Sequence, residues 1–412
     1  MKKIINNKFL VLSICIIVLN LLIKGFLVTS YPNSISPEEI DLITRLSFFK
    51  SFDPYSLRYI IVVVSSLFAT LSFILLYRIT KNLSWSFLSG LLLTYSPWIF
   101  IISRYSNFYL VVLSLCISSF LFFYKSKLRY ILIFFLILIS GYFLYQNKIF
   151  ITSNFINDFG GIFRLMDFKN LYFTGDYTST FIRIPKTGFF LFFEVLVFLY
   201  GLYKLVLERG NDQIKRIIIE IFFIGLMWFF ITPSNLIISN KSMFIFYSIG
   251  LVIAFGYSSL MSKKAIVAWF IMPLIICGFI FYQELFYFHF DIKNSSDWGF
   301  AEEKISRLLE KNSQNINSVY VSGDASSFIK YLPLFGKNFT NEKIEIVESD
   351  WIRDKAMFKC LEKKILCVFK ESDLLLTTLE KDDLREKIYY NNGLLAYLIL
   401  SKESLKTNVL NK

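Results

Sequence analysis

Histidine is nearly absent from this sequence, and that scarcity excludes several kinds of active site. The one histidine is His289, and the five cysteines show no metal-binding spacing. A zinc site built from protein ligands is therefore not expected, and the residues indicate no bound metal or cofactor. The C-terminal part contains neither a glycine-rich phosphate loop nor the pattern of a catalytic triad, and the chain shows no internal repeat.

Apolar residues, in contrast, are abundant and gathered into long runs. They make up 55% of the 412 residues, and 47 residues are phenylalanine. Soluble domains average roughly 45–50% apolar residues, so the clustering rather than the average predicts membrane-spanning helices. We expect a polytopic α-helical membrane protein with about nine transmembrane helices. The runs are Phe9–Ile23, Tyr59–Tyr77, Trp85–Ile102, Phe108–Tyr124, Tyr130–Tyr145, Phe189–Tyr203, Ile217–Ile231, Met243–Leu260 and Ala265–Phe286.

The net charge of +13 follows from where the basic residues lie. They gather in alternate gaps between the apolar runs, so they indicate membrane orientation rather than a nucleic-acid partner. By the positive-inside rule, we expect a multi-pass protein of the cell membrane with a cytoplasmic N-terminus and an extracytoplasmic tail. The gaps are Lys2–Lys8, Arg78–Lys81, Lys125–Arg129, Lys204–Arg216 and Lys263–Lys264.

The character of the chain changes near its last apolar run. We expect a transmembrane domain in residues 1–288 and a soluble extracytoplasmic α/β domain in residues 289–412, because strand and helix patterns alternate there. Cys360 and Cys367 can form a disulfide if this domain lies outside the cytoplasm. The expected strands are Ser318–Ser322, Lys343–Val347, Lys364–Phe369, Lys387–Tyr390 and Leu394–Leu400, and the expected helices are Ala301–Leu309, Ala325–Leu334, Asp354–Leu361 and Ser372–Leu379.

Three carboxylates follow the first apolar run on the expected outer side. Glu38, Glu39 and Asp41 come directly after Pro37. If a helix begins after Pro37, these groups can cap its N-terminus and offset its dipole, which the spacing by itself favours. The alternative is a general base held beside a membrane cavity.

Basic residues on the expected outer side are few. Arg58, Arg104 and Lys241 lie at helix ends, where they either snorkel to the interface or bind the phosphate of a lipid carrier. Glu194 lies inside the sixth run, where a carboxylate usually faces a cavity or a cationic partner. Asp176 follows Gly175 in a long outer segment, and alone this pair is a turn signal.

Several segments, in their order along the chain, together resemble a known family. They are Ser36-Pro37-Glu38-Glu39-Ile40, Ser51–Arg58, Leu93–Arg104 with its Ser-Pro-Trp…Ser-Arg pattern, Leu171–Gly188 followed by Glu194, and Thr232-Pro233-Ser234. The pattern resembles membrane glycosyltransferases of the GT-C fold, in particular glycosyltransferase family 39, the group related to protein O-mannosyltransferases and the aminoarabinose transferase of lipid A. The tail resembles the small α/β domain that many such proteins carry.

The resemblance implies transfer of a sugar from a polyprenyl-phosphate donor to an envelope lipid, glycan or protein on the outer face. In that picture the lipid-linked sugar is a co-substrate, and Glu38 occupies the family's catalytic aspartate position. The resemblance implies that Glu38 and Glu39 are catalytic. It implies that Arg58, Arg104 and Lys241 bind the lipid phosphate, and that Asp176 and Glu194 shape the site.

Two departures from the family pattern favour a rival interpretation. Glutamate replaces the aspartate at Glu38, and the segment Ile40–Leu57 is shorter than its counterpart in relatives. Both departures fit a catalytically inactive envelope protein that binds a glycan or protein partner. A further alternative is a lipid or solute transporter, for which internal repeats and broken helices would be the sign.

Overall fold

The computed structural model describes the main helices and strands of the chain. The described residues are 2–26, 28, 36, 39–40, 43, 54–104, 108–126, 128, 131, 167, 169–174, 188–207, 212–231, 241–263, 265–292, 299–336, 339, 341–348, 359–360, 362–370, 386–390 and 395–401. The expected spans Tyr130–Tyr145, Asp354–Leu361 and Ser372–Leu379 lie wholly or mostly outside these residues.

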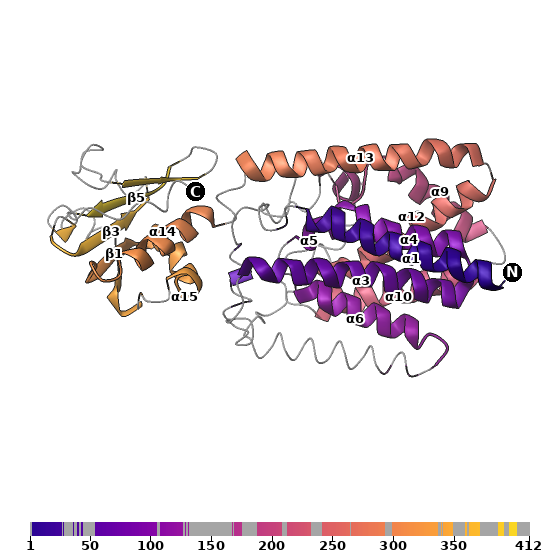
Figure 1. The fold of residues 1–412 in the computed structure, drawn as a ribbon, viewed down its shortest axis with the longest axis horizontal. Coiled ribbons are helices and arrows are strands. Elements are labelled where there is room, and N and C mark those ends of the chain that lie inside the picture. The colour runs from indigo at the N-terminus through magenta and orange to yellow at the C-terminus, as the bar shows by residue number, and fades with distance from the viewer. Residues whose placement is uncertain are drawn as a thin grey trace. The chain divides into compact units, whose positions relative to one another are not determined.

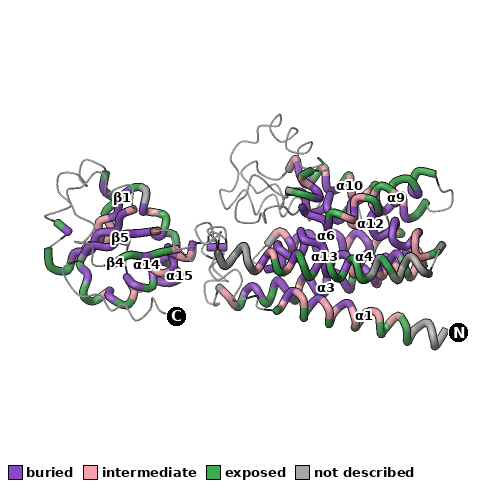
Figure 2. The backbone as a smooth tube through the Cα atoms, turned by 90° about the horizontal axis from the view of Figure 1, so that it is seen from above, coloured by how far each residue is buried: buried purple, intermediate pink, exposed green. Residues whose placement is uncertain are grey.

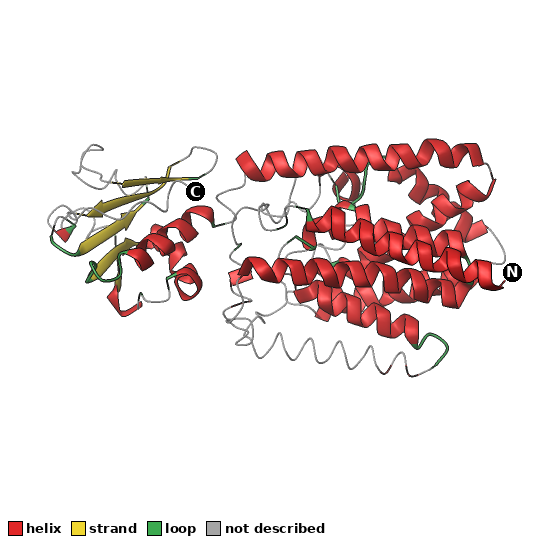
Figure 3. Cartoon of the chain, viewed as in Figure 1, coloured by secondary structure: helices red, strands yellow, loops and turns green. Residues whose placement is uncertain are grey.

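The chain divides into two compact units. The first contains Met1–Val28 and Ser56–Phe286, and the second contains Thr29–Tyr55 and Tyr287–Lys412. Helices form the first unit, whereas the second contains a sheet flanked by short helices (Figure 3). The division at residue 288 expected from the sequence leaves Thr29–Tyr55 with the membrane helices, but in the structure this segment groups with the C-terminal unit.

Among the described residues, three helices are long and apolar enough to span a membrane: α1, α3 and α12, within Asn7–Gly25, Tyr55–Thr80 and Met243–Ser262. The protein is therefore mostly helical, with the character of a multi-pass membrane protein (Figure 1). The helices are α1 (Lys2–Gly25), α3 (Pro54–Thr80), α4 (Leu83–Tyr95), α5 (Pro97–Ile102), α6 (Phe108–Phe122), α9 (Glu194–Leu207), α10 (Asp212–Ile231), α12 (Met243–Lys263) and α13 (Ala265–Ile292), with a π-helical turn η2 (Asn170–Thr174).

Helix α12 lies at the centre of this unit, in contact with α4, α9 and α10. Two glycines allow α9 and α12 to approach closely. A Cβ at Gly201 would collide with the carbonyl oxygen of Val252, and a Cβ at Gly256 with that of Val197. Small residues at a helix crossing are typical of membrane proteins, where packing rather than exclusion of water holds helices together.

Helices α1 and α9 have many exposed positions (Figure 2), and large apolar side chains occupy many of them. Leu22 of α1 is 64% exposed, and Leu196 and Val206 of α9 are 74% and 76% exposed. Water would disfavour a continuous apolar face of this kind, whereas lipid chains satisfy it. The burial pattern thus agrees with helices that face a bilayer.

The second unit contains a five-stranded mixed sheet with strand order β2-β1-β3-β5-β4. Strand β1 pairs in parallel with β2 and β3, while β5 pairs antiparallel with β3 and β4. The elements in chain order are α14 (Phe300–Lys311), β1 (Ser318–Ser322), the 3₁₀ helix η3 (Gly323–Tyr331), α15 (Leu332–Phe335), the 3₁₀ turn η4 (Asn341–Lys343), β2 (Ile344–Val347), β3 (Ile365–Phe369), β4 (Glu386–Tyr389) and β5 (Leu395–Ser401).

The five expected strands are confirmed within one or two residues. The expected helix Ala325–Leu334 differs, since the chain forms η3 and then the short α15. Pro333 stands in the first turn of α15, where its missing N–H costs no hydrogen bond. The amphipathic helix α14 packs Ile305, Leu308 and Leu309 into the main core against the sheet. Cys360 and Cys367 form a buried disulfide in a second, smaller core.

Candidate functional site

A helix break at Ser96-Pro97 divides the third expected span, Trp85–Ile102, into α4 and α5. Ser96 is extended, with φ −65° and ψ 134°, because a residue before proline is disfavoured in the helical region. Pro97 then starts α5, where its N–H would have no partner in any case. The break separates α4 from α5, and Arg104 comes two residues after the end of α5.

The break also brings other elements toward α5. The backbone N–H of Trp98 donates a 3.1 Å hydrogen bond to the carbonyl oxygen of Phe189, just before α9. Phe246, near the start of α12, has its ring centre 5.7 Å from Trp98 and 4.4 Å from Phe189. The starts of α9 and α12 therefore lie close to the start of α5.

The Arg104 side chain is fully buried and held on several sides. Its Nη2 donates a 2.7 Å hydrogen bond to the carbonyl oxygen of Phe26, and its Nη1 donates a 3.3 Å bond to that of Lys24. The guanidinium carbon lies 5.1 Å from the ring centre of Phe100 and 5.3 Å from that of Phe286. The end of α1, α5 and the end of α13 thus meet at Arg104. We call this end of the helical unit the Arg104 end.

A second buried cation, Lys24, lies at the Arg104 end and was not among the residues singled out from the sequence. Its Nζ donates hydrogen bonds to Ser65 Oγ at 2.6 Å and to the carbonyl oxygen of Leu93 at 2.5 Å. Both acceptors are neutral, and no carboxylate among the described residues pairs with this lysine. The interruption of the first apolar run by a lone lysine was the sequence signal for it.

Glu194 stands at the start of α9, fully buried. Its Oε2 accepts a 3.0 Å hydrogen bond from the backbone N–H of Leu191, so one oxygen caps the helix. Its Oε1 is buried and has no hydrogen-bond partner among the described residues. The phenols of Tyr95, Tyr172 and Tyr257 lie near enough to interact electrostatically with this carboxylate.

The other two candidate cations of the helical unit are buried as well. Arg58, in the second turn of α3, has no exposed surface, and Lys241, just before α12, is 1% exposed. The Lys241 ammonium lies 4.7 Å from the ring centre of Phe229, near the end of α10. Cation–π contact of this kind holds a charged group at a defined position.

Glu39 lies in the second unit and forms a capping box with Ser36. The Ser36 N–H donates a 3.0 Å hydrogen bond to Glu39 Oε2, and the Glu39 N–H donates a 3.2 Å bond to Ser36 Oγ. Capping, one of the two interpretations open from the sequence, therefore applies to Glu39. Glu38 and Asp176 lie outside the described residues.

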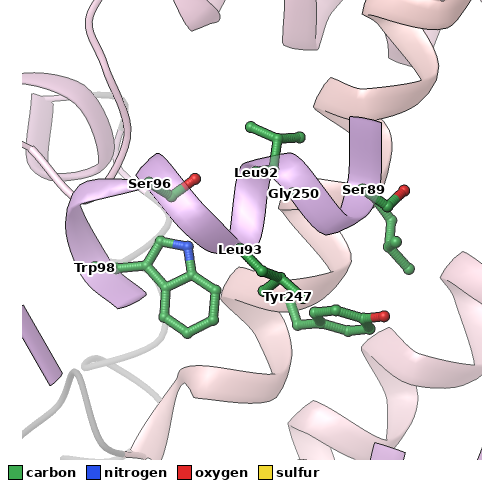
Figure 4. Close-up of a pocket in the computed structure, with 8 residues that line it drawn as sticks. Ser89, Leu92, Leu93, Ser96, Trp98, Tyr247 and Gly250 are labelled. Carbon is green, nitrogen blue, oxygen red and sulfur yellow. The ribbon is translucent and has the colours of Figure 1, made fainter. Parts of the chain in front are cut away.

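A small pocket lies between α4 and α12, beside the Ser96 break (Figure 4). It has room for about one water molecule, so it cannot hold a sugar. The hydroxyl of Tyr247 hydrogen-bonds to that of Ser72. The hydroxyl of Ser96, which also lines the pocket, is buried and has no hydrogen-bond partner among the described residues. The lining residues are Ser89, Leu92, Leu93, Ser96, Trp98, Tyr247, Gly250 and Leu251.

Arg104 contacts the backbone of Lys24 at the Arg104 end. Three further charged side chains of the helical unit are buried as well: Arg58 on α3, Lys241 just before α12 and Glu194 at the start of α9. Within the described part of the chain, no group of three or more histidine, cysteine, aspartate or glutamate side chains is placed to hold a metal ion. Comparison of the chain with known protein families, with curated proteins and with solved structures gave no match.

Proposed function

We propose that this protein is a membrane glycosyltransferase of the GT-C type, which transfers a sugar from a polyprenyl-phosphate donor to an envelope acceptor on the extracytoplasmic face. The donor's phosphate would bind at the Arg104 end, and its prenyl chain would lie in the bilayer. The acceptor is a hydroxyl group of a lipid, glycan or protein.

The observation that carries this proposal is the burial of the candidate phosphate-binding residues. Arg58, Arg104 and Lys241 are 0%, 0% and 1% exposed. A snorkelling side chain would extend its charged group into the interface, but these three groups are enclosed by protein. Buried cations near the end of a membrane span are costly, and a bound anion is a common reason for keeping them.

The disulfide between Cys360 and Cys367 supports the orientation in this proposal. Disulfides persist in oxidising compartments and are rare in the cytosol. An extracytoplasmic C-terminal unit, together with the basic gaps on the opposite side, favours a multi-pass arrangement of about nine spans with a cytoplasmic N-terminus.

The chemistry requires one base and one stabiliser of the leaving group. In the proposed reaction, the acceptor hydroxyl loses its proton to a carboxylate while its oxygen bonds to the anomeric carbon of the sugar. The bond from that carbon to the phosphate oxygen breaks, and the polyprenyl phosphate leaves with the electron pair. Arginine stabilises the added negative charge. We assign the base to Glu38, because Glu39 Oε2 already accepts the Ser36 N–H.

Donor binding is tested with purified protein and a radiolabelled polyprenyl-phosphate sugar. Arg104→Lys removes the planar guanidinium, and we expect affinity to fall at least about tenfold. The matched control is Arg216→Lys on α10, whose side chain is 63% exposed. Equal affinity in all three proteins, with unchanged thermal unfolding, would contradict a phosphate site at Arg104.

Transfer is tested separately with Glu38→Gln. This variant should bind the donor normally but transfer no sugar, while Glu342→Gln, an exposed carboxylate of the second unit, should be fully active. Full activity of Glu38→Gln would remove the proposed base. A wild-type protein that binds the donor and never transfers it would instead support the non-catalytic envelope protein. The capping role of Glu39 favours that second candidate, because it engages one of the two acidic groups.

A further inference from the structure

The segment Thr29–Tyr55, which includes the first two residues of α3, groups with the C-terminal unit rather than with the rest of the helices. Contacts group Thr29–Tyr55 with Tyr287–Lys412, although more than 230 residues separate the two along the chain. This segment carries Ser36 and Glu39, the described part of the acidic sequence after the first helix. What holds it to the C-terminal unit therefore decides where those residues lie.

An apolar cluster attaches this segment to the C-terminal unit. Ile40 is 1% exposed and packs with Tyr331 and Phe335, which are 1% and 9% exposed. Tyr55 and Leu334 pack against the same group. The cluster joins Ile40 and Tyr55 to η3 and α15 of the C-terminal unit.

A hydrogen bond also attaches the segment to the C-terminal unit. The Tyr55 hydroxyl donates a 2.7 Å hydrogen bond to Glu303 Oε2 on α14. Arg307 holds the other oxygen, since its Nε and Nη2 lie 2.9 Å and 2.8 Å from Glu303 Oε1. The Arg307 guanidinium lies 4.5 Å from the ring centre of Phe335, so the polar and apolar contacts share one partner. Tyr55 thus docks on a carboxylate that is already oriented.

The capping box transmits this attachment to the acidic sequence. Ile40 directly follows Glu39, and its N–H donates a 3.1 Å hydrogen bond to the Ser36 carbonyl oxygen. Together with the two capping bonds, this ties Ser36, Glu39 and Ile40 to one another. Anchoring Ile40 therefore also restrains Ser36 and Glu39.

We infer that the C-terminal unit positions the acidic segment for catalysis, with Ile40 and Tyr55 as its anchors on Phe335, Tyr331 and Glu303. These are positioning residues, which act through the turn that they hold. The catalytic consequence rests on the proposed glycosyltransferase function, whereas the attachment itself does not. The C-terminal unit thus holds the segment through η3, α14 and α15.

The attachment is tested by hydrogen exchange of the full-length protein in detergent. Phe335→Ala and Tyr55→Phe should each speed exchange of the 36–43 amides about tenfold, because both weaken the anchor and allow the segment to open locally. The control Ile346→Ala changes an exposed residue of β2 and should leave these amides unaffected.

Amides of β3 report whether the C-terminal unit remains folded. If Phe335→Ala also speeds exchange of the β3 amides, that variant has destabilised the whole unit. Tyr55→Phe then provides the test, because it removes only one hydroxyl group. In a double-mutant cycle, Glu303→Gln added to Tyr55→Phe should cause little further change, as expected for two partners of one bond. Unchanged exchange of the 36–43 amides in Tyr55→Phe would overturn the inference.

Activity gives the second measurement. With the donor saturating, Tyr55→Phe should lower kcat several-fold with little change in KM for the donor, because Arg58, Arg104 and Lys241 rather than this segment are proposed to bind the donor phosphate. A purely structural role would lower the active fraction and leave kcat per folded molecule unchanged. If the wild-type protein shows no transfer, the proposed function is wrong. The hydrogen-exchange measurement still tests the attachment of the segment, because it does not depend on activity.

Discussion

The hydroxyl group of Tyr397 on β5 donates a 2.7 Å hydrogen bond to Oε1 of Glu302 on α14. Ser327 on η3 lies 2.7 Å from the same hydroxyl, so three elements meet at one buried carboxyl group. Its other oxygen, Oε2, is buried and has no hydrogen-bond partner among the described residues. Burial raises the pKa of Glu302, and the hydrogen bond from Tyr397 offsets part of that rise.

The raised pKa predicts that the C-terminal unit loses stability as pH rises. An acid whose pKa is higher in the folded than in the unfolded state penalises folding once it ionises. The penalty is absent below the unfolded pKa of about 4.3 and grows until pH exceeds the folded pKa. We expect Glu302→Gln, which keeps an acceptor for Tyr397, to be stabilised by about 1–3 kcal/mol at pH 7 and to match the wild type near pH 4.

This prediction is checked through protection factors of the β1 and β5 amides, which already correct for intrinsic exchange at each pH. The control Glu345→Gln alters an exposed carboxylate of β2 and should show no pH-dependent difference. A Glu302→Gln variant less stable than the wild type at pH 7 would show that the ionised carboxylate is favoured in the folded unit.

The close crossing of α9 and α12 predicts opposite effects for two glycines of the same helix. Gly256→Ala should destabilise the helical unit by about 1–3 kcal/mol, because the new Cβ meets the carbonyl oxygen of Val197. Gly250→Ala should be neutral or stabilising by up to about 1 kcal/mol, since no atom lies within 4 Å of its Cβ position. Thermal unfolding in detergent measures both, and equal midpoints would argue against the crossing.

The disulfide predicts both stability and compartment. Its cysteines are 7 residues apart, so replacing both with serine should cost the C-terminal unit about 2–3 kcal/mol by the loop-closure estimate. In intact cells, a variant with serine at Cys15, Cys116 and Cys277 should react with a membrane-impermeant maleimide only after reduction. Labelling without reductant would show free thiols outside, and labelling confined to broken cells would place this unit in the cytoplasm.

Most of the tail strands were predictable because apolar and β-branched or aromatic residues recur in short runs between polar segments. Ser318–Ser322 is an example in which the bounds agree to the residue. The order of strands was not predictable, because pairing depends on crossovers whose direction local patterns do not encode. The Ser96-Pro97 pair could be recognised in the sequence as a possible helix break. The apolar residues on either side do not indicate how the two helices are oriented after the break.

The candidate site was predictable in its residue types more than in their roles. Arg104 drew attention because basic residues are scarce on the expected outer side, and the structure places it in a buried junction. Capping by Glu39 could be proposed from the Ser-x-x-Glu spacing alone. The partners of Lys24, which are Ser65 and Leu93, come from other helices and could not be read from a single run.

The sequence by itself determined that long apolar helices dominate the chain and that a mixed α/β unit follows them, because burial periodicity and run length are local properties. Only the tertiary structure decided that Thr29–Tyr55 belongs with the C-terminal unit and that the basic residues at the helix ends are enclosed. The reason is physical: attachment and enclosure depend on contacts between residues far apart in the chain, such as Ile40 with Phe335. The hydrophobic pattern of a segment does not indicate which distant residue each side chain will contact.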